Sequence, residues 1–121
     1  MIKRHSISFK HAFEGLRWVL KTQPNYRIHI LLSILSLFGS WFFKVSYVEF
    51  LTILLLITMG FVIETINTGI EATTDAIDKK IREDIKIAKD VSAAAMLIFA
   101  IGSFVIACII FVPKILLFVK L

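Results

Sequence analysis

The chain has 121 residues, of which 58% are hydrophobic, and a net charge of +5 at neutral pH. A water-soluble domain of this length would not be so apolar, so we expect one integral membrane domain. The positive charge does not indicate a nucleic-acid-binding protein, because the Lys and Arg residues flank apolar segments in the pattern that sets membrane topology. The single cysteine, Cys108, excludes a disulfide framework within the chain.

Residues 8–22 have the pattern of an amphipathic helix. Apolar side chains such as Phe9 and Phe13 recur at helical spacing, and charged side chains such as Lys10 lie mostly on the opposite face. A basic face over an aromatic-rich apolar face is typical of a helix that lies in the membrane interface. Pro24 predicts the end of this helix, because proline disfavours helical conformation at the residue before it.

Three apolar segments are each long enough to cross the hydrocarbon core of a bilayer, and they lie at 26–43, 48–70 and 91–112. A mixed-charge hairpin at 71–90 joins the second segment to the third. Pro113 follows the third segment, and the apolar tail after it either extends the helix or lies at the interface. We therefore expect an all-α membrane protein with three transmembrane helices and one interfacial helix.

The distribution of basic residues predicts the orientation of the chain. Six Lys and Arg residues precede position 28 and five lie at 71–90, whereas three lie on the opposite side of the membrane. The positive-inside rule then places the N-terminus and the charged hairpin in the cytoplasm, and the C-terminus outside.

A column of polar side chains follows the cytoplasmic end of the second span. At about 100° per residue, one side of a helix presents Glu64, Asn67, Glu71, Asp75 and Asp78. Hydrocarbon penalises such groups by a few kcal/mol each unless they are paired or hydrated, so the column indicates a functional site. A single helical hairpin can hardly supply partners for Glu64 and Asn67, and we therefore expect a homo-oligomer.

Other polar groups are expected to approach the column at the cytoplasmic boundary. Lys89 and Asp90 return at the start of the third span, and Lys10, His11 and Gln23 approach from the interfacial helix. A carboxylate beside an apolar wall is a candidate general base, a second carboxylate with amide oxygens suits Mg²⁺, and a lysine suits phosphate oxygens. Together these groups match phosphoryl transfer from ATP to a hydroxyl that arrives from the lipid. The chain has no Gly-rich phosphate loop of either common type.

Two other functions fit the same column. A small oligomeric channel or transporter would line a cation path with the carboxylates, although they crowd one boundary and the middle of every span is apolar. A catalytically silent protein of the same fold is the other alternative.

Single residues also have alternative roles. Glu64 could be a structural acid paired with Lys or Arg, Asp78 fits a solvated helix end, and Ser92 fits substrate binding or packing equally well.

The polar column also resembles a family signature. The matching residues are Glu64-x-x-Asn67-x-x-Ile70-Glu71-Ala72-x-x-Asp75-x-Ile77, then Ala88-Lys89-Asp90 and Ala93-Ala94. This motif is similar to that of the prokaryotic diacylglycerol kinase family, which includes the undecaprenol kinases, and segments 9–16 and 25–29 resemble the family as well. The resemblance implies a homotrimer in the bacterial inner membrane. It also implies active sites at subunit boundaries that use MgATP to phosphorylate diacylglycerol or undecaprenol.

The resemblance implies a role for each matching residue. Glu64 takes the position of the general base, and Glu71 that of a metal-binding glutamate. Gln23 stands where family members often carry a second metal-binding glutamate, and its carbonyl oxygen can bind Mg²⁺ without supplying charge. The positions that match the ATP site are His11, Glu71, Lys89 and Asp90. The residues expected to support the site or contact the substrate are Lys10, Asn67 and Asp75. Segment 25–29 leans slightly toward the undecaprenol kinases.

Overall fold

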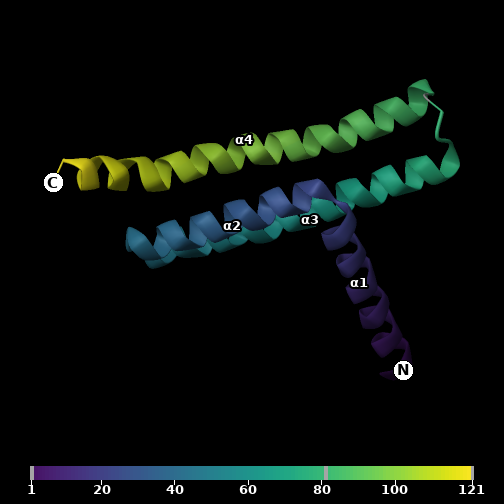
Figure 1. The fold of residues 1–121 in the computed structure, drawn as a ribbon, viewed down its shortest axis with the longest axis horizontal. Coiled ribbons are helices and arrows are strands. Elements are labelled where there is room, and N and C mark those ends of the chain that lie inside the picture. Colours follow the sequence, from purple (N-terminus) through teal and green to yellow (C-terminus); the bar gives the residue numbers. More distant parts are fainter. Residues whose placement is uncertain (1, 81, 121) are drawn as a thin grey trace.

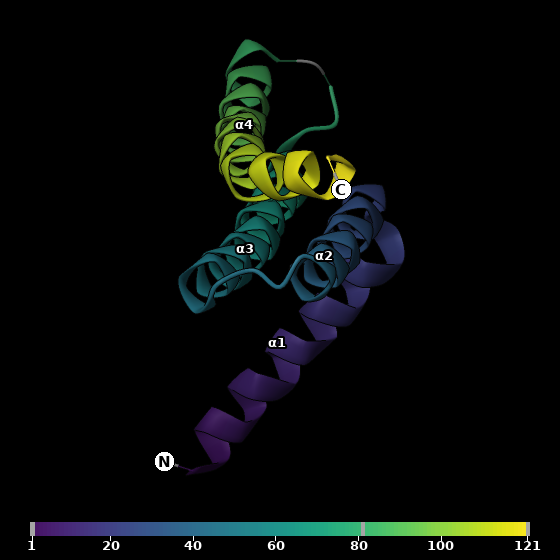
Figure 2. The ribbon, with the colours of Figure 1, turned by 90° about the vertical axis from the view of Figure 1, so that its left-hand side faces the viewer.

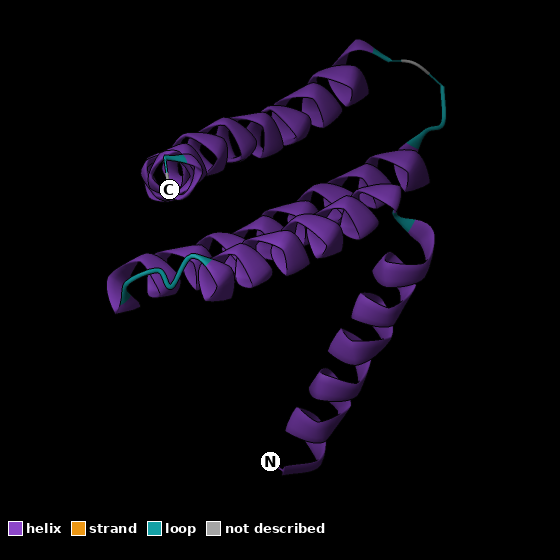
Figure 3. Cartoon of the chain, turned by 60° about the vertical axis from the view of Figure 1, so that its left-hand side comes forward, coloured by secondary structure: helices purple, strands orange, loops and turns teal. Residues whose placement is uncertain are grey.

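The computed structural model describes residues 2–80 and 82–120, which form four α-helices (Figure 1). The helices are α1 (Ile2–Thr22), α2 (Pro24–Phe42), α3 (Tyr47–Ile77) and α4 (Glu83–Val119). α3 packs against both α2 and α4, while α1 leaves this three-helix bundle at a steep angle. Figure 3 shows only helices and connecting loops in the described part of the chain, so the all-α class is confirmed.

A proline separates the first two helices, as predicted. Gln23 has extended backbone angles (φ −98°, ψ 114°), because Pro24 follows it and begins α2. α1 extends further toward the N-terminus than the predicted helix at 8–22, and α2 begins two residues before the predicted span at 26–43.

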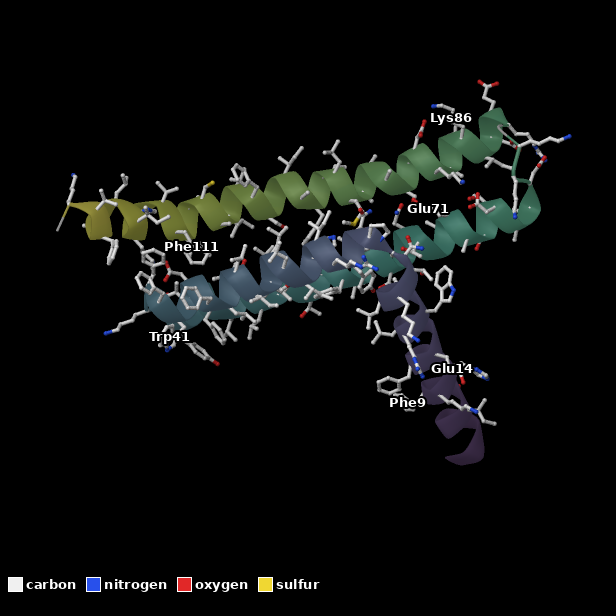
Figure 4. All side chains as sticks on the ribbon, in the orientation of Figure 1. Phe9, Glu14, Trp41, Glu71, Lys86 and Phe111 are labelled. Carbon is white, nitrogen blue, oxygen red and sulfur yellow. The ribbon has the colours of Figure 1, made fainter. Side chains whose placement is uncertain are left out.

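A short turn joins α2 to α3 at the end of the bundle that carries Trp41 and Phe111 in Figure 4. Ser46 begins α3 with a capping box: its Oγ accepts from the Glu49 N–H at 3.3 Å, and its own N–H donates to Glu49 Oε2 at 2.7 Å. The other carboxylate oxygen of Glu49 accepts from Lys114 Nζ at 2.6 Å, which ties α3 to α4.

The charged connection between α3 and α4 is shorter than the predicted hairpin at 71–90. α3 continues to Ile77 and α4 begins at Glu83, so only five residues, 78–82, separate the helices. Hydropathy marks where a helix leaves hydrocarbon but does not mark where the helix ends. The acids at the start of α4 suit a helix N-terminus. The hydrogen-bonded Arg82 guanidinium holds the pKa of Asp84 below its usual range.

The apolar tail extends the last helix. α4 runs through Pro113 to Val119, and Figure 2 shows that its last turns change direction relative to the rest of the helix. Proline removes one helical hydrogen bond and bends the axis, which a membrane helix tolerates when neighbouring groups satisfy the backbone.

Two of the described helices, α3 and α4, are long and apolar enough to cross a membrane. Most residues of both spans are exposed on the single chain, including the bulky apolar Leu97, Ile98 and Phe104. Such a surface fits lipid rather than water, and we treat the chain as an integral membrane protein. α2 does not meet the same criterion, so a count of three spans stays a prediction.

Candidate active site

Contacts between α2 and α3 set the level of the α1–α2 junction. The Tyr26 hydroxyl on α2 lies 3.4 Å from the carbonyl oxygen of Phe61 and is hydrogen bonded to the Thr65 hydroxyl, both on α3. The two helices are antiparallel, so Gln23 comes to about the level of Asn67. The junction therefore lies beside the polar column that the sequence predicts.

Contacts between α3 and α4 bring the start of α4 to the same level. Ser92 Oγ donates to Asn67 Oδ1 at 2.5 Å, and Lys89 is paired with Asp75. This antiparallel register places Lys89 and Asp90 beside the part of α3 that carries Glu71, which is where the sequence analysis expects them.

The interior of this region is polar. Glu64 is 1% exposed and Asn67 is 6% exposed, whereas few apolar side chains of the single chain are buried. Glu64 Oε2 and Thr68 Oγ1 are buried, and among the residues that the structure describes neither atom has a hydrogen-bond partner. An unpaired buried carboxylate oxygen is costly, and it is available to accept a proton from a bound hydroxyl.

A chain of hydrogen bonds connects α4 to Glu71. Ser92 donates to Asn67, and Asn67 Nδ2 donates to Glu71 Oε1 at 3.0 Å. Glu71 is half-buried and lies seven residues beyond Glu64, about 10 Å along the helix axis. The column therefore offers two carboxylates at different depths.

Charged side chains surround a pocket at the end of the bundle. Lys89 pairs with Asp75, and Lys86 pairs with Asp90. The pocket has a volume of about 220 Å³, and its lining residues are Asp75, Asp78, Lys79, Lys80, Ile85, Lys86, Lys89 and Asp90. Four lysines against three aspartates leave this lining weakly positive, which can attract a polyanion such as a triphosphate.

The predicted residues of α1 do not reach this region within one chain. His11 Nδ1 lies 3.1 Å from Glu14 Oε2 and Lys10 Nζ lies 3.9 Å from Glu14 Oε1, with all three side chains exposed. In Figure 4, Glu14 lies along α1 well away from Glu71. One chain therefore groups Glu64, Asn67, Glu71, Asp75, Lys89 and Asp90, and it leaves Lys10 and His11 apart.

The described residues contain no cluster of three or more His, Cys, Asp or Glu side chains that could hold a metal ion by itself. Mg²⁺ in phosphate-transfer sites needs only one or two carboxylates, because substrate phosphates and waters complete its shell. Glu71 fits this mode of binding, since Asn67 orients one of its oxygens. Gln23, at a similar level, offers an uncharged oxygen.

An apolar cavity of about 340 Å³ lies between α2, α3 and α4. Its lining includes His29, Ile57 and Phe99 at one end and Phe111 at the other. Gly60 lies beside this end of the cavity, because a Cβ added there would be 3.3 Å from His29 and 3.1 Å from Phe99. Glu64 follows Gly60 by one helical turn, so the cavity begins about one turn from Glu64. Sequence reasoning did not predict the cavity, because periodicity does not report how far two helices separate.

An all-helical membrane protein with a buried carboxylate, a second carboxylate and a lysine-rich pocket fits the class of membrane phosphotransferases. The sequence model of prokaryotic diacylglycerol kinase matches residues 10–111. The chain therefore belongs to the prokaryotic diacylglycerol kinase family, which confirms the resemblance of its motif, and by class it is a lipid kinase. This membership favours a kinase over a channel or transporter.

Two relatives are similar over most of the chain. The undecaprenol kinase of Bacillus subtilis is 35% identical over 113 residues, which cover 93% of this chain and 92% of that protein. The diacylglycerol kinase of a Synechocystis species is 27% identical over 111 residues, which cover 91% of this chain and 63% of that protein.

Proposed function

We propose that the chain transfers the γ-phosphate of ATP to the hydroxyl of a lipid alcohol, with Glu64 as the general base. The observation that carries this proposal is the buried Glu64 Oε2, which has no hydrogen-bond partner among the described residues. As the alcohol oxygen forms a bond to the γ-phosphorus, its proton passes to Oε2. The bond from the γ-phosphorus to the β,γ-bridging oxygen breaks, and ADP leaves.

The lysine-rich pocket is our candidate for the phosphate chain of ATP. Lys89 and Lys86 line it beside Asp90, at the level of Glu71. Glu71, and Gln23 through its carbonyl oxygen, would hold Mg²⁺, which when bound neutralises phosphate charge. Asn67 and Asp75 support this arrangement through their bonds to Glu71 and Lys89.

We propose undecaprenol as the preferred lipid. The support is the similarity to an undecaprenol kinase over 92% of that relative's length. The apolar cavity, which begins one turn from Glu64, is the place we assign to the hydrocarbon chain, because ligand cavities of a few hundred Å³ are typically apolar with few polar groups.

We also propose that the active protein is a homotrimer in the bacterial inner membrane, with α1 and the α3–α4 connection on the cytoplasmic side. The support is that α1 leaves its own bundle (Figure 1). In the proposed trimer, α1 would bring Lys10 and His11 to the column of a neighbouring subunit. A mixed oligomer of Glu64→Gln and His11→Ala chains tests this arrangement. Partial recovery of activity supports shared sites, and none contradicts them.

The decisive test of the activity uses the wild-type chain in reconstituted bilayers. We expect labelled phosphate to pass from ATP to lipid only with Mg²⁺, and faster to undecaprenol than to diacylglycerol. A channel, a transporter or a silent protein would label neither lipid. Faster labelling of diacylglycerol would contradict the proposed substrate but not the kinase.

A further inference from the structure

Ser92 makes a buried polar contact that the proposed reaction does not use directly. It lies on α4, is 8% exposed, and donates from Oγ to Asn67 Oδ1 at 2.5 Å. Two ion pairs also join α3 to α4, Lys89 with Asp75 and Lys114 with Glu49. Both ion pairs lie nearer the ends of the bundle than the contact of Ser92 with Asn67. Ser92 therefore sits where the two helices face each other at the depth of the site.

Glu71 and Ser92 together fix the orientation of the Asn67 amide. The Glu71 carboxylate only accepts hydrogen bonds, so Nδ2 faces it and donates to Oε1 at 3.0 Å, and Oδ1 on the other side of the amide accepts from the Ser92 hydroxyl. In the flipped orientation the amide oxygen would face a carboxylate oxygen. The two bonds thus select one amide orientation.

We infer that Ser92 is a positioning residue for Glu71, acting through Asn67 to hold the carboxylate in the orientation that binds the Mg²⁺ of MgATP. The inference rests on the proposed function, because it takes Glu71 as the metal ligand. Without the Ser92 hydroxyl, the buried Oδ1 of Asn67 lacks its donor, and the amide turns toward another partner. Glu71 then loses the bond that orients it, and such outer contacts tune metal affinity.

Metal binding can be measured without turnover. The probe is Mn²⁺ with a non-hydrolysable ATP analogue, bound to the full-length oligomer in bilayers without lipid substrate and followed by electron paramagnetic resonance. We expect Ser92→Ala to weaken Mn²⁺ binding about threefold to tenfold, the size of one lost hydrogen bond. Ser40→Ala is the matched control. Ser40 is also buried, but its hydroxyl bonds within α2, and binding should stay unchanged. Binding to Ser92→Ala as tight as to the wild type would overturn the inference.

A double-mutant cycle separates positioning from general damage. In the Asn67→Ala background, Ser92→Ala should cause no further loss, because the partner through which it acts is gone. Equal losses in both backgrounds would overturn the inference. Thermal unfolding without metal is measured for each variant, so that binding is referred to the folded fraction.

Glu71→Gln distinguishes this inference from the proposed function. If Glu71→Gln weakens Mn²⁺ binding while Ser92→Ala does not, only the role of Ser92 fails. If Glu71→Gln binds as tightly as the wild type, the metal assignment in the proposed function fails, and the inference fails with it.

Discussion

The hydroxyl of Tyr26 on α2 is hydrogen bonded to the hydroxyl of Thr65 on α3, the residue that follows Glu64. Tyr26 is 1% exposed, and its ring packs against Phe61 with the centroids 5.4 Å apart. Among the residues whose burial the structure describes, Tyr26 and Glu64 have the largest fully buried side chains. α2 is thus fixed to α3 at the depth of the candidate base.

Tyr26→Phe removes the hydroxyl and keeps the ring. We expect it to lower the free energy of unfolding by about 1 kcal/mol, the net value of a typical hydrogen bond. Tyr26→Ala should cost several times more, because it also leaves a cavity. Denaturation in a fixed detergent or bilayer system measures both variants. Equal losses would show that the hydroxyl alone matters and would contradict the packing role of the ring.

Gln23→Glu should lower the Mg²⁺ concentration needed for half-maximal activity. It adds a carboxylate at about the level of Asn67, and hard cations bind charged oxygens more tightly than neutral ones. The dependence of the rate on free Mg²⁺ at saturating ATP measures the change. Gln23→Ala should have the opposite effect. If neither variant changes the Mg²⁺ dependence, Gln23 is not near the metal.

Lys89→Met should raise the KM for ATP about tenfold or more and leave the lipid KM nearly unchanged. The ammonium is our candidate contact for phosphate, and a charge-assisted hydrogen bond contributes about 1.5–3 kcal/mol. Unfolding should change little, since the side chains of Lys89 and Asp75 are 37% and 51% exposed, and solvent weakens such a pair. A variant with an unchanged ATP KM would remove Lys89 from the nucleotide site.

The pair of Glu49 and Lys114 should stabilise the far end of the bundle without affecting catalysis. Their side chains are only 28% and 24% exposed, so Glu49→Gln leaves a partly buried ammonium without its charged partner. We expect a loss in the free energy of unfolding, with activity unchanged. The exchanged pair, Glu49→Lys with Lys114→Glu, should recover part of that stability, and no recovery would indicate that geometry rather than charge dominates.

The positions of the helices could be predicted from the spacing of apolar residues and from the position of Pro24, because both signals are local in the sequence. The break at Pro24 and the polar column beginning at Glu64 can be read from neighbouring residues alone. Helix ends were less predictable, because α3 stays helical for seven residues beyond the apolar run at 48–70. Local hydrogen bonds support that extension, and hydropathy does not register them.

The return of Lys89 and Asp90 to the level of the column could be predicted, but the exact register between the helices, which decides which side chains touch, could not. The contact of Ser92 with Asn67 joins residues 25 positions apart, and that of Tyr26 with Thr65 joins residues 39 apart. Neither pair is marked by spacing in the sequence. The chemistry of the column was predictable from the types of its residues, whereas the side chains that orient it required the structure.

The most direct test of the general-base assignment compares wild type with Glu64→Gln. Gln keeps nearly the same size but accepts no proton at neutral pH, so the hydroxyl of the substrate is no longer deprotonated. Transfer of labelled phosphate from ATP to undecaprenol is measured in bilayers, together with the oligomeric state and nucleotide binding. We expect transfer to fall by at least about a hundredfold, with the oligomer and nucleotide binding retained. Turnover close to that of the wild type would contradict the assignment.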